Sequence, residues 1–167
     1  EEWSYDDAGN VITEIRRNGA VITNGYDAMN RLVSRSGSGI FNSNYTYDLL
    51  GRLRIASKPG DAMSNQFTYN ALGWLLTEAT TADGATRTTT YGYDSVGRMT
   101  SLAGPESWVL TTNYQYNNAS EITRIKKSTD ADAAAYASYG YDDLGRRTGV
   151  TRQNGANTAY TYAASNL

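Results

Sequence analysis

The stretch Tyr45-Thr46-Tyr47-Asp48-Leu49-Leu50-Gly51-Arg52-Leu53 contains the end of one strand, a turn and the beginning of the next strand. Tyr45 and Tyr47 alternate with a polar residue, which is the period of a β-strand, so both rings are expected on one face. Asp48 can accept hydrogen bonds from the backbone amides that follow it, and Gly51 can adopt the left-handed conformation that reverses the chain. The stretch therefore predicts a β-hairpin.

The same pattern recurs along the whole chain with a period of 21 to 25 residues. Its main tyrosines are Tyr5, Tyr26, Tyr47, Tyr69, Tyr93, Tyr116, Tyr141 and Tyr162. A regular period of this length indicates a repeat architecture, in which each unit is one supersecondary element that stacks on its neighbours. We therefore expect residues 1–167 to form a single array of about seven units.

Each unit is expected to turn twice. The first turn begins with Asp or Asn and reaches its left-handed position three residues later, which makes these residues structural. The clearest pairs are Asp48 with Gly51, Asp94 with Gly97, and Asp142 with Gly145. The second turn is less uniform, as in Asn18-Gly19 and Asp83-Gly84, and its variable length explains why the period varies.

Two strands per unit predict roughly fifteen strands in an antiparallel meander. We expect an all-β fold of tandem β-hairpins that forms a long curved antiparallel sheet, either a partial spiral shell or an open barrel, because twist accumulates in sheets of more than about ten strands. Ladders of stacked Tyr rings and a row of Leu and Val side chains would stabilise it. The Arg that follows Gly51, and its equivalents, would form a polar outer face, and pairing of these Arg with a neighbouring turn Asp is the alternative, which contributes little at a surface.

The composition argues against several classes of protein. The net charge is −2, and the 15 Lys and Arg are interspersed with 17 Asp and Glu, so the chain lacks the basic footprint of a nucleic-acid binder. The absence of His and Cys removes the commonest general base, metal ligand and thiol nucleophile. No stretch is long and apolar enough to cross a bilayer. We expect no cofactor, no metal, no nucleic-acid partner and no membrane span.

Paired carboxylates offer the main route to catalysis or to calcium binding. The candidates are Asp6-Asp7, Asp142-Asp143, and Asp130 with Asp132. Turn formation by Asp6 and Asp142, with solvation of the neighbouring carboxylates, explains these residues more simply. We therefore expect no catalytic residues, and the chain is not expected to be an enzyme.

The aromatic side chains are the feature that can carry binding, because flat rings stack on the faces of sugars. Trp74 occupies the slot that holds Arg in most other units, so we expect it to be exposed and able to anchor a ligand. The candidate ligand-facing residues are Trp74, Trp108, Tyr45, Tyr91, Tyr114 and Tyr139. Packing in cross-strand ladders is the simpler explanation for the Tyr rows.

The motif Tyr-Asp-x-x-Gly-Arg-Leu of residues 47–53 resembles the YD repeat of RHS-type proteins. Variants of the motif occur at residues 5–10, 93–98 and 141–146, and the resemblance covers essentially the whole chain. It implies a strip of β-hairpins wound into a hollow shell. In bacterial family members, among them polymorphic toxins and insecticidal toxin complexes, the shell encloses a toxic C-terminal polypeptide, and in animal teneurins it forms an extracellular barrel.

The resemblance implies a non-catalytic segment of such a shell, whose partners are the remainder of the parent shell and an enclosed toxin or effector. It also implies a secreted or cell-surface location. The alternative is a carbohydrate-binding or adhesive repeat module at the cell surface, with a glycan as partner. The chain begins within a repeat and lacks the Asp-Pro-x-Gly-Leu cleavage signature of the family, so we expect an excised piece. Its unpaired end strands are expected to favour self-association.

Overall fold

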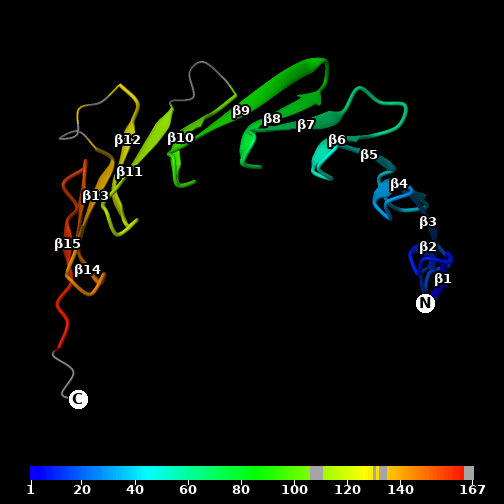
Figure 1. The fold of residues 1–167 in the computed structure, drawn as a ribbon, viewed down its shortest axis with the longest axis horizontal. Helices are drawn as coiled ribbons and strands as arrows, with labels where there is room; N and C mark the ends of the chain where they lie inside the picture. Colours follow the sequence, from blue (N-terminus) through cyan, green and yellow to red (C-terminus); the bar gives the residue numbers. More distant parts are fainter. Residues whose placement is uncertain (106–110, 130, 132–134, 164–167) are drawn as a thin grey trace. The chain divides into compact units, whose positions relative to one another are not determined.

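The computed structural model describes residues 1–105, 111–129, 131 and 135–163. The regular elements of these residues are all β-strands, and they follow one another in one antiparallel sheet in the order of the sequence, from β1 to β15 (Figure 1). The order does not close into a ring, because β1 and β15 stand at its two ends. The expected all-β fold of tandem hairpins in an antiparallel sheet is therefore confirmed.

The chain divides into two compact units, Glu1–Thr88 and Thr89–Leu167. The strands that lie in the first unit are β1 (Glu2–Tyr5), β2 (Val11–Ile15), β3 (Val21–Tyr26), β4 (Leu32–Gly37), β5 (Ser43–Tyr47), β6 (Leu53–Ser57), β7 (Ser64–Tyr69) and β8 (Leu75–Ala82). The boundary falls within β9 (Ala85–Tyr93). The strands that follow in the second unit are β10 (Met99–Ala103), β11 (Thr112–Tyr116), β12 (Ile122–Lys127), β13 (Ala137–Tyr141), β14 (Arg147–Arg152) and β15 (Thr158–Ala159).

The turn between β5 and β6 shows how the repeated sequence reverses the chain. The N–H of Gly51 donates to the carbonyl of Asp48 at 3.0 Å, and the N–H of Asp48 donates to the carbonyl of Arg52 at 2.9 Å. One carboxylate oxygen of Asp48 accepts the N–H groups of Leu50 and Arg52, both at 2.9 Å. Gly51 has a φ of +80°, the left-handed conformation that a residue without Cβ adopts at low cost.

We call this five-residue arrangement the YD turn, and it occurs at each of the seven repeats. The turns begin at Asp6, Asp27, Asp48, Asn70, Asp94, Asn117 and Asp142. Two of them place a residue other than Gly at the left-handed position, namely Asn30 with a φ of 58° and Ser120 with a φ of 65°. Asn is the best substitute for Gly at positive φ, so the geometry is kept at these positions despite the change of residue.

Every hairpin also contains a β-bulge one step beyond its YD turn. Between β5 and β6, Thr46 pairs with Ile55 but Tyr47 pairs with Leu53, which leaves Arg54 without a partner across the hairpin. The same shift of register occurs in the other six hairpins. A bulge bends the strand and increases its twist. The alternation of residue types did not predict these bulges, because both faces of the sheet are largely open and the burial pattern then specifies the register only weakly.

Neighbouring hairpins are joined by backbone pairing along only part of their length. Strands β6 and β7 pair from Ile55 with Gln66 to Ser57 with Ser64, beside the turn that lies opposite the YD turn. The pairings of β4 with β5, and of β12 with β13, include two residue pairs each. The halves of the strands that lie next to the YD turns therefore depend on other contacts between hairpins.

The sheet encloses very little core. Among the described residues, the buried hydrophobic ones are Ile22, Ala135 and Val150. The accessible surface is 11160 Å², whereas a compact protein of 18.2 kDa exposes about 8,100 Å² and two separate compact domains of half that mass expose about 9,800 Å². The excess means that the array consists of a single layer, with both faces of the sheet largely open.

Replacement of Gly51 tests the geometry of the YD turn. Gly51→Val is expected to lower the free energy of unfolding by about 1 kcal/mol or more, because a β-branched residue resists positive φ. The matched control is Gly51→Asn, since Asn30 holds the same position in the preceding repeat with a φ of 58°. Urea unfolding should show a clearly larger loss for Val than for Asn, and equal losses would contradict the turn geometry.

Candidate functional site

The repeated Arg of the motif joins each repeat to the next. In the turn of Asp48, the Nε of Arg52 lies 2.6 Å from a carboxylate oxygen of Asp48, so the side chain is held within its own repeat. Its Nη1 donates to the carbonyl of Asn70, in the following YD turn, at 3.1 Å. The guanidinium carbon lies 4.7 Å from the ring centroid of Tyr69, also in the following repeat. One side chain therefore makes an ion pair within its own repeat, and a hydrogen bond and a cation–π contact across the junction.

This arrangement recurs in both units. The guanidinium carbons of Arg31, Arg98 and Arg146 lie 4.7, 4.8 and 4.6 Å from the ring centroids of Tyr47, Tyr116 and Tyr162. Each of these Arg side chains also pairs with the Asp that opens its own turn, at 2.6 to 2.7 Å. We call this combination of turn Asp, Arg and the following Tyr the Arg latch.

The main tyrosines add a second contact at the same junctions. The hydroxyl of Tyr69 donates to the carbonyl of Leu53 in the preceding repeat at 2.8 Å. Equivalent bonds run from Tyr26 to Val11, Tyr47 to Leu32, Tyr116 to Met99, Tyr141 to Ile122 and Tyr162 to Arg147. The acceptor is always the residue just before the bulge, where the backbone ladder between hairpins has ended. The Tyr hydroxyl thus donates a hydrogen bond to a carbonyl that has no backbone partner in the sheet.

The ionisation of the latch follows from these hydrogen bonds. The backbone N–H of Arg52, followed by its guanidinium, holds the pKa of Asp48 below its ordinary value against the opposing effect of burial. The guanidinium of Arg31 is the main cause of the lowered pKa of Asp27. Burial raises the pKa of Tyr116 although Arg98 partly offsets it, so its hydroxyl remains a donor at neutral pH.

The residues of the latch vary together. The repeats that carry Arg at the latch position all begin their turn with Asp, whereas the two turns that begin with Asn are followed by Trp74 and Glu121. Asn117 donates its side-chain amide to Glu121 at 2.6 Å, which reverses the polarity of the Asp–Arg pair. In the first repeat, Asn10 donates both to Asp6 at 2.9 Å and to Asn30 of the next turn at 3.0 Å. This joint variation is the signal in the sequence that could have revealed the latch.

The latch differs from what the sequence pattern favoured. The pattern suggested ladders of Tyr rings and a polar outer face of Arg, but at four junctions the stacking partner of the main Tyr is Arg from the preceding repeat. The side chain of Arg52 is 26% exposed, which places it within the junction rather than on an outer face. Arg stacks flat on aromatic rings and also pairs with carboxylates, so one residue type meets both requirements.

The aromatic residues predicted to face a ligand are distributed over both units. Trp74, Tyr45, Tyr91, Tyr114 and Tyr139 are all half-buried, and Trp108 lies outside the described residues. Tyr45 lies beside one hollow, and Tyr139 contacts the guanidinium of Arg147 with its ring centroid 4.9 Å away. The structure does not bring these aromatic residues together in one place, and ligand binding by them stays a prediction.

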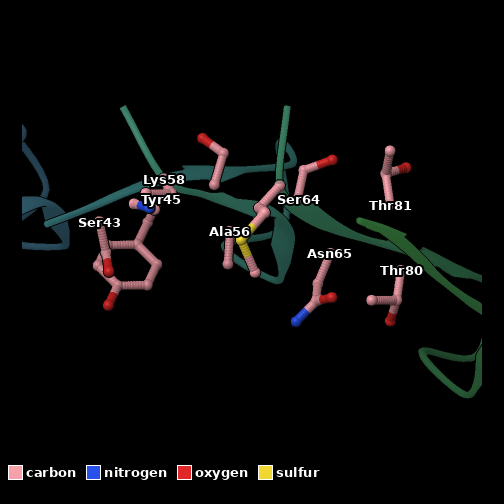
Figure 2. A pocket seen from close by; sticks show the side chains of 10 residues that line it. Ser43, Tyr45, Ala56, Lys58, Ser64, Asn65, Thr80 and Thr81 are labelled. Carbon is pink, nitrogen blue, oxygen red and sulfur yellow. The ribbon is translucent and has the colours of Figure 1, made fainter. Parts of the chain in front are cut away.

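The hollow beside Tyr45 has a volume of about 220 Å³ and extends across β5 to β8. Most of its lining residues carry a hydroxyl or an amide group, among them Asn65 and Thr80, although most of the lining surface is apolar. Figure 2 shows Tyr45, Asn65 and Thr80 on one side of the ribbon and Ser64 and Thr81 on the other. The cross-strand register agrees, because it pairs Asn65 with Thr80 and Ser64 with Thr81. The polar groups therefore diverge to opposite faces of the sheet instead of converging on a ligand.

Two of the carboxylates that were considered for catalysis are acceptors in turns. Asp6 and Asp142 accept the backbone N–H groups of their own YD turns. Asp130 and Asp132 lie outside the described residues. Within the described part of the chain, no three acidic residues gather in a way that could hold a metal ion. The same part contains no helix with the length and apolar character needed to span a membrane.

Comparison with known proteins agrees with this architecture. The sequence matches the RHS Repeat family over residues 5–39 and 69–107. A comparison with curated protein sequences gives no match. The motif and the family match over these two segments, together with the shared fold, support an RHS/YD-repeat family.

Solved structures of toxin complexes share the fold. A crystal structure of TcdB2-TccC3 without its hypervariable C-terminal region has a TM-score of 0.76 and 16% identity, and the match covers 94% of this chain and 9% of that one. The structure of TcdB2-TccC3-TEV gives 0.74 and 17%, with the same coverage. The Tc holotoxin pore of Photorhabdus luminescens gives 0.58 and 16%, covering 96% of this chain and 12% of that one. The chain thus spans about a tenth of the length of these proteins.

Substitution of Arg52 tests the latch. Arg52→Lys keeps the positive charge but loses the flat stacking on Tyr69 and the paired donors, so we expect the free energy of unfolding to fall by about 1 kcal/mol. The control is Arg54→Lys, because Arg54 is the exposed bulge residue of the same strand. Urea unfolding measures the free energy of unfolding of the two variants. A loss of this free energy that is no greater for Arg52→Lys than for Arg54→Lys would contradict the latch.

The latch also predicts how stability depends on pH. The turn Asp residues have pKa values lowered by folding, so their contribution is complete above the unfolded value of 3.8 and is lost as the pH falls through the folded values. Urea midpoints measured from neutral to strongly acidic pH should therefore drop below about pH 4.

The double variant Asp48→Asn with Asp94→Asn should flatten this acid dependence, because Asn makes the same turn at Asn70 and Asn117 but does not titrate. The control is Asp143→Asn, which removes one carboxylate outside the hydrogen bonds of the turn. An acid dependence that is unchanged in the double variant would show that other groups control it.

Proposed function

We propose that the chain is a non-catalytic structural segment of an RHS/YD-repeat wall, and that in a longer parent protein this wall encloses or presents a toxin or effector polypeptide. The observation that carries the proposal is the Arg latch together with the Tyr hydroxyl bond. The repeated polar residues of the motif are engaged in contacts between repeats, at six junctions in the case of the hydroxyl. Residues committed in this way hold neighbouring hairpins together and are not available to act on a substrate.

The exposed surface supports a role as one part of a larger assembly. The tips of the YD turns carry large apolar side chains, with Leu49 at 103%, Leu50 at 74% and Leu144 at 76% exposure. Exposed apolar side chains that recur at the tips of successive turns are typical of surfaces that contact other parts of a protein. We infer that the remainder of a parent repeat shell covers the tips of the YD turns.

The proposed cargo and location rest on the similar structures. Those structures are complexes that include TcdB2-TccC3 and a Tc holotoxin pore, and this chain spans about a tenth of their length. A wall with the same fold would enclose or present a toxin or effector in its own parent protein. That parent protein would then be secreted or carried at the cell surface. No reaction is proposed for the wall itself, because the Asp residues that open its YD turns serve as acceptors in those turns.

The experiment that tests this function begins with the reading frame on both sides of Glu1 and Leu167. We expect further Tyr-Asp-x-x-Gly units and then a C-terminal polypeptide without the repeat. In the purified parent protein, that polypeptide should resist a protease that digests it readily when it is expressed alone. A frame without further repeats, or a C-terminal polypeptide that is digested equally fast in both forms, would contradict the enclosing role.

Glycan binding is the competing function. Saturable binding of a polysaccharide by the chain, lost on Tyr45→Ala but kept on Tyr5→Ala, would favour a carbohydrate-binding module over a wall. We expect no such binding, since the polar groups around Tyr45 diverge to the two faces of the sheet (Figure 2).

A further inference from the structure

One junction of the second unit lacks the Arg of the latch. Glu121 stands at the latch position of the turn that begins at Asn117, and the main tyrosine of the following repeat is Tyr141. The hydroxyl bond of this junction is kept, because Tyr141 donates to the carbonyl of Ile122 at 2.9 Å. Its backbone geometry therefore follows the other junctions, whereas the side chain at the latch position carries the opposite charge.

A hollow occupies the space beside Tyr141. Its volume is about 320 Å³, and it is lined by Glu121, Ile122, Ile125, Tyr139, Tyr141, Gly145 and Arg147. At four other junctions, the guanidinium carbon of an Arg lies 4.6 to 4.8 Å from the ring centroid of the equivalent Tyr. In the described residues, no guanidinium stacks on the ring of Tyr141. The hollow thus corresponds to the position that a stacked guanidinium occupies at those four junctions.

The carboxylate of Glu121 lies beside this hollow with one oxygen still able to accept. Its Oε2 accepts the side-chain amide of Asn117 at 2.6 Å, and its Oε1 has no donor among the described residues. Oε1 is 2.9 Å from the position that a Cβ would take on Gly145. At the junction of Arg52, Nη1 is 3.8 Å from the corresponding position on Gly73. Glu121 therefore places a negative charge next to the turn where the other junctions place a positive one.

We propose that this hollow binds the guanidinium group of an arginine residue from another polypeptide. The guanidinium would stack on the ring of Tyr141 and donate to Oε1 of Glu121, and the apolar side chains of Ile122 and Ile125 would contact its methylene stem. A planar guanidinium fits better than an ammonium, because it stacks on a ring and offers several donors in one plane. The Arg latch shows this stacking geometry four times in the same chain.

Arg147 limits where the arriving cation can lie. Its guanidinium carbon is 4.9 Å from the ring centroid of Tyr139, so the charge of Arg147 is located at that ring. A second cation over Tyr139 would be repelled, whereas the ring of Tyr141 lies next to the carboxylate of Glu121 in the lining of the hollow. The site therefore has one favourable position for a cation, between Tyr141 and Glu121.

The test uses the intact chain and N-acetyl-arginine amide as the probe, with chemical shifts of the Tyr141 ring and the Glu121 side chain as the readout. We expect saturable shifts at both residues in the millimolar range, weakened by added salt because the ion pair is partly exposed. N-acetyl-citrulline amide has the same shape without the charge and should produce no saturable shift. Equal binding of the two probes, or shifts confined to other residues, would overturn the proposal.

Two variants of Glu121 complete the test. Glu121→Gln removes the charge at nearly constant volume and should weaken binding about tenfold, since it replaces a charge-assisted bond with a neutral one. Glu121→Arg should fill the hollow with the chain's own guanidinium and abolish binding, while urea unfolding shows that the fold is retained. Undiminished binding to either folded variant would also overturn the proposal.

Discussion

Backbone hydrogen bonds between neighbouring hairpins end before the YD turns, and this limit governs the choice of side chains at the junctions. At the junction of β6 and β7 the register stops at Ile55, because the bulge at Arg54 turns the strand away from its neighbour. A carbonyl just before the bulge would then lack a partner. The hydroxyl of Tyr69 supplies the missing donor to Leu53, and the guanidinium of Arg52 closes the rest of the gap. Tyr and Arg of the motif therefore replace a section of backbone ladder.

The identity of each motif residue follows from that replacement. Tyr is needed because its ring offers a surface to the guanidinium while its hydroxyl reaches the carbonyl. Asp is needed because one of its oxygens holds the turn while the other orients Arg, as Asp48 does for Leu50, Arg52 and the Arg52 side chain. At Asn117 and Glu121 a pair of reversed polarity keeps only the hydrogen bond within the turn. The motif thus encodes the contact between repeats as well as the hairpin.

The hairpins were predictable from sequence because they are local. Asp48 and Gly51 lie three residues apart, and the preference of Gly for positive φ acts whatever the rest of the chain does. The latch was not predicted, because Arg52 and Tyr69 become neighbours only once the register and the bulge are set. Pairing of Arg with a turn Asp was considered only as a weak surface contact, and the stacking of the same Arg on the Tyr of the following repeat was not predicted. Trp74 was expected to be exposed from its place in an Arg slot, but it is half-buried.

The two kinds of turn, the YD turns at one end of the strands and the opposite turns at the other end, differ in how much their length can vary. The YD turn has the same five-residue geometry in every repeat, since a change of its length would move Asp, Arg and Tyr out of reach of one another. The opposite turns range from the tight Asp83-Gly84 reversal to the longer connection between β12 and β13, and the strands beside them also differ in length, with β8 and β9 the longest, so the period varies from 21 to 25 residues. Backbone pairing between hairpins lies next to these variable turns, where it requires no particular side chain. Specific side chains join neighbouring hairpins next to the YD turns, and backbone hydrogen bonds join them next to the opposite turns. Repeats of unequal length can therefore still form one continuous sheet.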